Sequence, residues 1–202
     1  MQFEHIKIAL VLIAAILVTA CGGSAQVIIV QQFPEVVSEP RDIRAAIVFD
    51  ETFSTYVAKP AKDITIDIGS AQVALLTNAF RGLFQQVQTV TSRDQLNPDT
   101  ELVIIPSVLQ VQLSTPSDYY LNVYEVWIKY NLDLETAEGE PIDSWFMPAY
   151  GKTPGSMLGS RSNAIEEATI VALRDAGAKL LLDFYRIPSV YGWMDQQKKL
   201  EQ

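Results

Sequence analysis

The sequence predicts an α+β fold in which two helices pack on one face of a mostly antiparallel sheet. Residues 122–135 alternate apolar and polar side chains over the length of a long strand. Residues 70–86 place apolar side chains three and four apart, as an amphipathic helix does. A second, alanine-rich helical stretch follows near the end of the chain, over residues 163–185. Strands that come before and between two helices favour the α+β class.

Residues 1–20 have the layout of a secretory signal peptide. A short polar start ends at Lys7, and residues 8–19 are almost purely apolar. This run is shorter than the roughly 20 apolar residues that cross a bilayer. Gly22-Gly23-Ser24 then follows without a charged flank. We therefore expect the segment to be removed.

The only cysteine, Cys21, follows Val18-Thr19-Ala20. This tetrad resembles the lipobox of bacterial lipoproteins; the alternative is an ordinary signal peptide followed by a chance cysteine. The resemblance implies cleavage before Cys21, diacylglycerol on its sulfur and acylation of the new amine, such as with palmitate. Two or more acyl chains anchor a protein stably. Because position 22 is glycine rather than aspartate, the resemblance also implies the inner leaflet of the outer membrane, with the domain facing the periplasm.

The mature chain has the size of one domain. Of 202 residues, 182 remain after removal of residues 1–20, which allows a sizeable core. We expect a lipidated tether over residues 21–42, a single periplasmic domain over 43–194 and a frayed tail over 195–202. An extended tether would reach roughly 70 Å, unless the β-prone segment Val27–Val30 docks onto the domain. The net charge of -9 argues against nucleic acid as a partner.

The composition restricts the available chemistry. His5 is the only histidine, and it lies in the segment expected to be removed. Without histidine and with its cysteine acylated, the mature chain lacks a Ser-His-Asp triad, a Cys-His pair, an imidazole zinc site and a disulfide. We therefore expect no catalytic residues, no metal, no cofactor and no enzymatic activity.

The first half of the domain is expected to hold three strands and one helix. Residues 43–49 and 64–68 are predicted strands, with a loop over 50–63 between them. Ser70 is the expected N-cap of the helix over 70–86. A short strand over 87–91 and a turn region over 93–101 follow.

The second half is expected to hold a strand, a hairpin and the long helix. Pro106 interrupts the strand over 102–113, which places it at a sheet edge or a bulge. Ala137-Glu138-Gly139 fits a three-residue hairpin loop with Gly139 in the left-handed region. Residues 150–161 are rich in glycine and serine and are expected to form a mobile loop. Asn163 and Glu166 form a candidate capping box, and Pro188 is expected to end the helix.

The hairpin loop sets a register, and the register predicts a partner-binding surface. It pairs Leu134 with Ile142 and Leu132 with Ser144 on the inner face, and Asn131 with Trp145 and Lys129 with Met147 on the outer face. A shift by one residue would place Asp143 in the core and is therefore disfavoured. Trp127, Trp145 and Met147 would then face outward, with Tyr119 and Tyr120 at the base of the hairpin. Aromatic residues and methionine are enriched where proteins bind partners. The alternative is that residues 27–30 or the tail around Trp193 cover this face.

Two other motifs have a simpler interpretation. Gly151-Lys152-Thr153 resembles the end of a P-loop, but position 146 is phenylalanine where that motif needs glycine. Asp50 and Glu51 follow a strand and could perform acid-base chemistry, but a solvated strand end is the favoured interpretation.

The order of elements over residues 43–186 is similar to that of small envelope lipoproteins, such as the curli-secretion lipoprotein or the lipoprotein activator of a penicillin-binding protein. The resemblance implies a non-enzymatic accessory protein that assists a larger envelope complex through protein contacts. An alternative is a lipid-handling or transporter-auxiliary lipoprotein, which predicts an apolar groove near Leu76, Phe80 and Phe84. A hydrolase that uses carboxylates alone would need Asp50 and Glu51 to be buried or to face a cleft.

Overall fold

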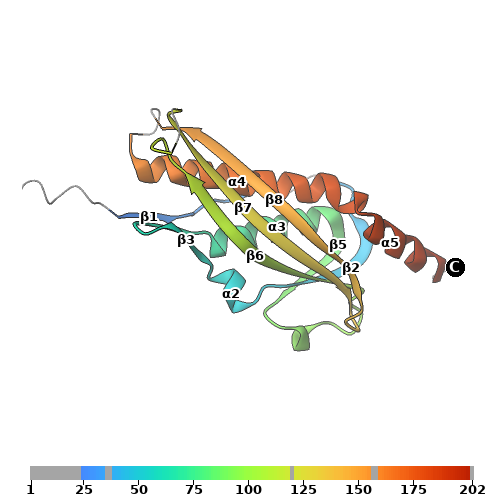
Figure 1. Ribbon diagram of the computed structural model, residues 1–202. Helices are drawn as coiled ribbons and strands as arrows, with labels where there is room; N and C mark the ends of the chain where they lie inside the picture. Colours follow the sequence, from blue (N-terminus) through green and yellow to red (C-terminus); the bar gives the residue numbers. More distant parts are fainter. Residues whose placement is uncertain (1–23, 35–37, 119–120, 156–158, 201–202) are drawn as a thin grey trace, which may run out of the picture.

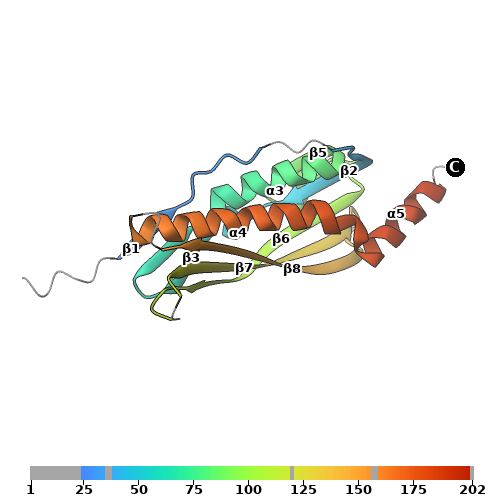
Figure 2. The ribbon, with the colours of Figure 1, turned by 90° about the horizontal axis from the view of Figure 1, so that it is seen from above.

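The computed structural model describes residues 24–34, 38–118, 121–155 and 159–200. Two helices lie on one side of a long, twisted sheet, and a smaller sheet extends it at one end (Figures 1 and 2). The elements in chain order are β1 (Ala25–Ile28), β2 (Arg41–Val48), α2 (Glu51–Ser54), β3 (Val57–Ala61), β4 (Ile64–Asp67), α3 (Gly69–Leu83), β5 (Phe84–Val90), a 3-10 turn (Arg93–Gln95), β6 (Leu102–Ser114), β7 (Val123–Thr136), β8 (Pro141–Pro154), α4 (Arg161–Asp183), a 3-10 turn (Phe184–Arg186) and α5 (Pro188–Leu200).

The large sheet has the strand order β5-β2-β6-β7-β8, and the small sheet has the order β1-β4-β3. Strand β2 runs parallel to β5 and β6, whereas β6, β7 and β8 form a long antiparallel meander. In the small sheet, β4 is parallel to β1 and antiparallel to β3. The predicted α+β class is confirmed, with a mixed sheet whose longest strands are antiparallel.

Helix α4 lies very close to the sheet because its contact face is made of small residues. Ala168, Ala172 and Ala176, which belong to the alanine-rich stretch predicted as a helix, are completely buried. Gly151 on β8 completes the contact. A Cβ atom at Gly151 would lie only 1.9 Å from the carbonyl oxygen of Ala168. The helix backbone therefore rests directly on the strand.

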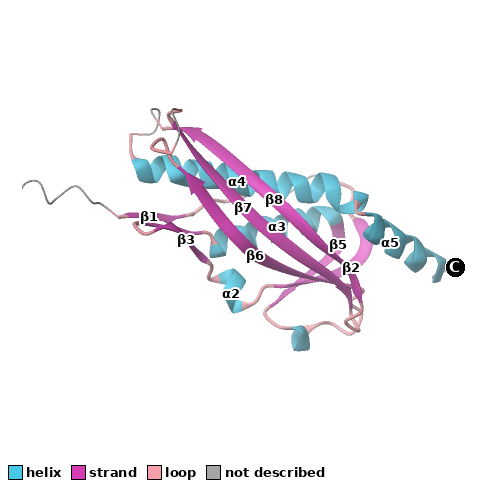
Figure 3. Ribbon diagram, viewed as in Figure 1, coloured by secondary structure: helices cyan, strands magenta, loops and turns pink. Residues whose placement is uncertain are grey.

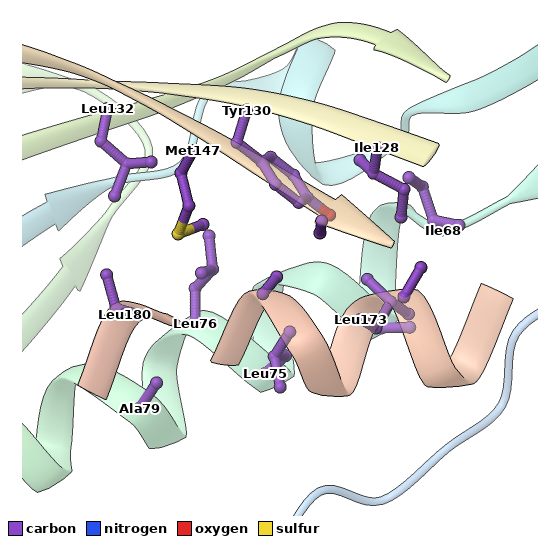
Figure 4. Packing of buried hydrophobic residues seen from close by; sticks show 14 of the residues in the cluster. Ile68, Leu75, Leu76, Ala79, Ile128, Tyr130, Leu132, Met147, Leu173 and Leu180 are labelled. Atoms are coloured by element: carbon purple, nitrogen blue, oxygen red, sulfur yellow. The ribbon is translucent and has the colours of Figure 1, made fainter. Parts of the chain in front are cut away.

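The space between the sheet and the two helices is filled by apolar side chains. Met147 and Leu132 point from the sheet toward Leu76 on α3 (Figure 4), and all three residues are at most 1% exposed. Tyr130 brings one polar group into this core. Its hydroxyl donates to Oε1 of Gln72 at 3.1 Å, and Nε2 of Gln72 donates to the carbonyl of Phe53 at 2.7 Å. This chain of hydrogen bonds links the sheet, α3 and α2.

The segment before the first predicted strand is part of the folded body. Strand β1 pairs with β4 from Ala25 to Ile28, and the side chains of Val27, Ile29 and Phe33 are buried. Asn78 on α3 donates to the carbonyl of Phe33 at 2.8 Å. The docking that the sequence left open for residues 27–30 therefore occurs, on the small sheet rather than on the outer face of the hairpin.

Both predicted helix caps are wrong by a few residues. Helix α3 follows Ile68, and its first amide, that of Gly69, donates to the side chain of Asp67 at 3.3 Å. Helix α4 is capped by Ser160, whose hydroxyl accepts from the Asn163 amide at 3.1 Å. In both cases a polar residue slightly earlier in the chain meets the free amides.

The hairpin register also differs from the prediction. Leu132 pairs with Trp145, Tyr130 with Met147 and Asn131 with Phe146. The register shifts between Leu134 and Glu135, which reverses the faces of the β8 residues. Asp143, which was expected to prevent this register, lies at the end of the sheet, where the hydroxyl of Ser189 on α5 donates to it. Gly139 has the predicted positive φ, of 93°.

Three further segments complete the comparison with the sequence. The expected loop over 50–63 contains α2 and β3. Pro106 lies just beyond Ile104, the last residue of β6 that pairs with β2, so its expected edge position is confirmed. Pro188 begins α5, and this helix continues to Leu200 through most of the tail expected to fray. Figure 3 shows α5 at the end of the molecule opposite β1.

Candidate partner-binding surface

The outer face of β6, β7 and β8 is the face opposite α3 and α4, and Figure 1 looks onto it. Trp127 on β7 is 40% exposed and Phe146 on β8 is 49% exposed. An exposed large side chain is common when it stands alone. Here the exposed rings lie on adjacent strands. We call the residues Trp127, Phe146 and Tyr150 the aromatic surface.

Trp127 and Tyr150 are the two residues of this surface whose rings are in direct contact. They are direct cross-strand partners, and their ring centroids lie 4.5 Å apart at an interplanar angle of 44°. The Tyr150 hydroxyl donates to Oε1 of Glu125 at 2.7 Å, and the Lys152 ammonium lies 3.8 Å from the same oxygen. The Trp127 indole therefore packs against a ring whose own position is fixed by hydrogen bonding.

The environment of Tyr150 keeps its phenol neutral. Loss of hydration and, to a smaller extent, the hydrogen bond to the Glu125 carboxylate together raise the pKa of Tyr150 to about 12. A carboxylate beside the phenol disfavours the phenolate because two negative charges would then meet. Tyr150 consequently remains a hydrogen-bond donor at any physiological pH.

The two edges of the antiparallel meander differ in what covers their backbone groups. Along β8, the Lys179 ammonium donates to the Pro148 carbonyl at 2.6 Å, and the Tyr150 amide donates to Asp175 at 2.9 Å. Side chains of α4 thus cover this edge, as sheets often require to prevent unwanted pairing. Strand β6 pairs with β2 only as far as Ile104.

Beyond that point, β6 and β3 line a groove of about 710 Å³ next to the aromatic surface. The edge groove, as we call it, is lined by Leu109–Ser114 of β6, by Tyr56 and Ala58–Pro60, and by Trp127. Leu109 is 58% exposed there. A bulge between Val108 and Gln110 interrupts the strand, so this edge favours side-chain contacts over the addition of a long strand.

The structure confirms one of the residues expected on the outer face and corrects two. Trp127 is exposed as predicted. The expectation for Met147 is wrong, because the shifted register buries it at 1% exposure. Trp145 is also on the inner side, where its ring meets Phe184 edge-on at 6.3 Å. Tyr119 and Tyr120, like Cys21, lie outside the described residues.

Sequence reasoning missed Phe146 and Tyr150. Phe146 was placed in the same strand but on the inner face, as a consequence of the incorrect register. Tyr150 was assigned to a mobile loop because glycine and serine follow it. The alternation Phe146, Pro148, Tyr150 could have identified both, had β8 been extended to Pro154.

The apolar groove of the lipid-handling alternative is absent at its expected place. Leu76 and Phe80 are completely buried and Phe84 is 1% exposed. The rings of Phe80 and Phe84 stack at 6.1 Å, and Phe184 closes against both edge-on. The space between helix and sheet is filled at this position.

The residues considered for chemistry also have structural explanations. Asp50 and Glu51 are both exposed, and Oδ1 of Asp50 caps α2 by accepting from the Phe53 amide at 2.7 Å. The requirement of the carboxylate-hydrolase alternative is therefore not met by this pair. Gly151-Lys152-Thr153 lies within β8 rather than in a loop before a helix. Within the described ranges, no group of three metal-ligating side chains comes together, and none of the helices has the length and apolar character needed to cross a bilayer.

Comparisons with known proteins concern the fold. Protein-family models and curated proteins give no match. Among solved structures, the chain is similar to a candidate neuraminyllactose-binding hemagglutinin homolog from Helicobacter pylori, with 11% identity, a TM-score of 0.53, and coverage of 83% of this chain and 96% of that one.

Two further solved structures are similar at lower scores. One is a Xanthomonas campestris protein of the DUF330 family, with 10% identity, a TM-score of 0.49, and coverage of 89% of this chain and 98% of that one. The other is a candidate lipoprotein from Caulobacter crescentus, with 12% identity, a TM-score of 0.44, and coverage of 74% and 90%. The Helicobacter pylori protein shares the overall fold; the narrower resemblance to curli-secretion or penicillin-binding-protein activator lipoproteins stays a prediction.

Proposed function

We propose that this protein is a non-enzymatic accessory lipoprotein, anchored through Cys21 in the inner leaflet of the outer membrane and facing the periplasm. It assists a larger envelope complex by binding a protein partner. The observation that carries the proposal is the aromatic surface, in which Trp127 and Phe146 are exposed while the core behind them is complete. A solvent-facing indole that is already held by Tyr150 loses little conformational freedom on binding.

The composition of the surface suits a protein partner. Tryptophan and tyrosine are the residues that most often dominate the binding energy of protein interfaces. Glu125 and Lys152 provide charges of both signs at the rim. The open part of β6 and the exposed Leu109 extend the contact area into the edge groove.

Copurification with matched variants tests this function. The lipidated protein would be isolated from detergent-solubilised envelopes as the wild type, as Trp127→Ala with Phe146→Ala, and as a control with Leu182→Ala and Tyr191→Ala. The control residues are also exposed, at 65% and 69%, but lie on α4 and α5. We expect a stable partner with the wild type and the control, and its loss from the aromatic-surface variant.

Each variant must first show the circular dichroism and thermal stability of the wild type. Because each of the four side chains is at least 40% exposed, we expect each substitution to change the stability by about 1 kcal/mol or less. Recovery of the same proteins with all three forms would contradict the role of the aromatic surface. Recovery of no partner with the wild type would contradict the proposed function as a whole.

A further inference from the structure

One end of the molecule is fixed relative to the lipid anchor by the position of β1. The amide of Ala25 donates to the carbonyl of Asp63 at 2.7 Å, in the turn between β3 and β4. Arg161, the first residue of α4, donates to the side chain of Asp63 at 2.8 Å. We call Ala25, Lys62, Asp63 and Arg161 the anchor end; Figures 1 and 2 both show β1 and the start of α4 together there, with α5 at the opposite end.

The chain between the anchor and this end is short. Only four residue steps separate Cys21 from Ala25, and at about 3.6 Å for each step they reach at most about 14 Å. The sequence had suggested a tether of 22 residues, and most of that length is used by the docking of β1 and of residues 29–33 on the body. By contrast, α4 extends about 34 Å away from the anchor end over its 23 residues.

The charges at the anchor end are balanced, although the chain as a whole carries a net charge of -9. Lys62 and Arg161 exceed Asp63 by one positive charge, which Asp118 offsets; Asp118 belongs to the connection between β6 and β7, at the same end of the molecule (Figures 1 and 2). Leu121, in the same connection, is 62% exposed. A neutral tip with an exposed leucine approaches anionic headgroups at lower electrostatic cost than the acidic remainder of the molecule.

We propose that the domain stands with its anchor end on the lipid headgroups and its α5 end directed away from the membrane. This inference rests on the lipid attachment in the proposed function. Trp127 lies four residues into β7, about 13 Å from the end of that strand. Trp127 and its cross-strand partner Tyr150 are then held within roughly 30 Å of the bilayer, so a partner that contacts them is itself held near the same membrane.

Site-directed spin labels test the orientation in the acylated, full-length protein. Acylation leaves Cys21 without a free thiol, so Lys62→Cys and Arg186→Cys each introduce a single labelling site. Both positions are exposed, one at the anchor end and one beyond the end of α4. The protein would be placed in phosphatidylethanolamine–phosphatidylglycerol vesicles that contain a nickel-chelating lipid, and relaxation of the nitroxide by the headgroup nickel would be measured.

We expect strong relaxation of the label at position 62 and none above background at position 186. A matched control inserts about 20 glycine and serine residues between Ser24 and Ala25, which adds a flexible coil of roughly 25 Å. This insertion should abolish the relaxation at position 62. Equal relaxation of both labels, as in a domain lying flat, or no relaxation at position 62, would overturn the orientation.

Mass spectrometry of the same samples separates the two proposals. If the protein is acylated at Cys21 but both labels show equal relaxation, only the orientation is contradicted. A protein that is not acylated contradicts the proposed anchor, and the orientation with it.

Discussion

Replacement of Gly151 by alanine should separate α4 from the sheet. The added Cβ atom would lie 1.9 Å from the Ala168 carbonyl oxygen and 2.3 Å from the Ala172 amide nitrogen. Both are backbone atoms, so no side-chain rotation can relieve the contact. Reaching an ordinary separation of 3.4 Å requires a displacement of about 1.5 Å, along a helix whose contact residues are completely buried.

Overpacking of a core typically costs about 1–3 kcal/mol, and contact with two rigid backbone atoms places Gly151→Ala at about 3 kcal/mol or above. For a domain of this size, that corresponds to a decrease in Tm of roughly 6–12 °C. Urea and thermal unfolding followed by circular dichroism would measure both quantities. Gly192→Ala is the matched control, because a Cβ there meets no atom within 4 Å and alanine in α5 should stabilise by about 0.5–1 kcal/mol. If Gly151→Ala unfolds at the wild-type temperature, the close contact between α4 and β8 is not present.

Three further predictions concern the core, the helix caps and pH. Tyr130→Phe leaves the buried side-chain oxygen Oε1 of Gln72 without its hydrogen bond from the phenol. We therefore expect the free energy of unfolding measured in urea to fall by about 1–3 kcal/mol, and an unchanged urea midpoint would contradict this. Ser160→Ala should cost about 1 kcal/mol because Ser160 caps α4, whereas Ser70→Ala, at the residue wrongly expected to cap α3, should be neutral or slightly stabilising. Equal effects would refute the cap assignment. Because the pKa of Tyr150 is about 12 in the folded protein against 10.0 for an unperturbed phenol, its contribution to stability is complete below pH 10 and is lost as the pH rises through about 12. Tyr150→Phe should therefore lose less stability than the wild type between pH 10 and pH 12, and parallel pH profiles would exclude the shift.

The elements with a strong local pattern were predictable from the sequence. The alternation in residues 122–135, the alanine stripe of α4 and the positive φ of Gly139 depend on nearby residues alone. The pairing of β1 with β4 and the parallel position of β2 between β5 and β6 depend on partners distant in the sequence. No local pattern specifies such a partner, so these features emerge only in the folded chain.

The hairpin register shows how one tertiary contact can change a predicted site. The observed register was expected to be disfavoured because it places Asp143 on the inner face, but Ser189 at the start of α5 provides a hydrogen bond for that carboxylate. The resulting shift buries Met147 and exposes Phe146. Trp127 was identified correctly because the alternation of β7 does not depend on its partner strand.

In-cell photocrosslinking tests the central claim, that the outer face of the meander is where the protein meets its partner. A benzophenone amino acid would replace Phe146 in one strain and Leu182 in another; both native side chains are exposed, one on β8 and the other on α4. We expect a discrete crosslinked adduct at position 146 that disappears when Trp127→Ala is added, and no such adduct at position 182. An adduct at position 182 alone, or an adduct at position 146 that persists unchanged with Trp127→Ala, would contradict partner binding at the outer face of the meander.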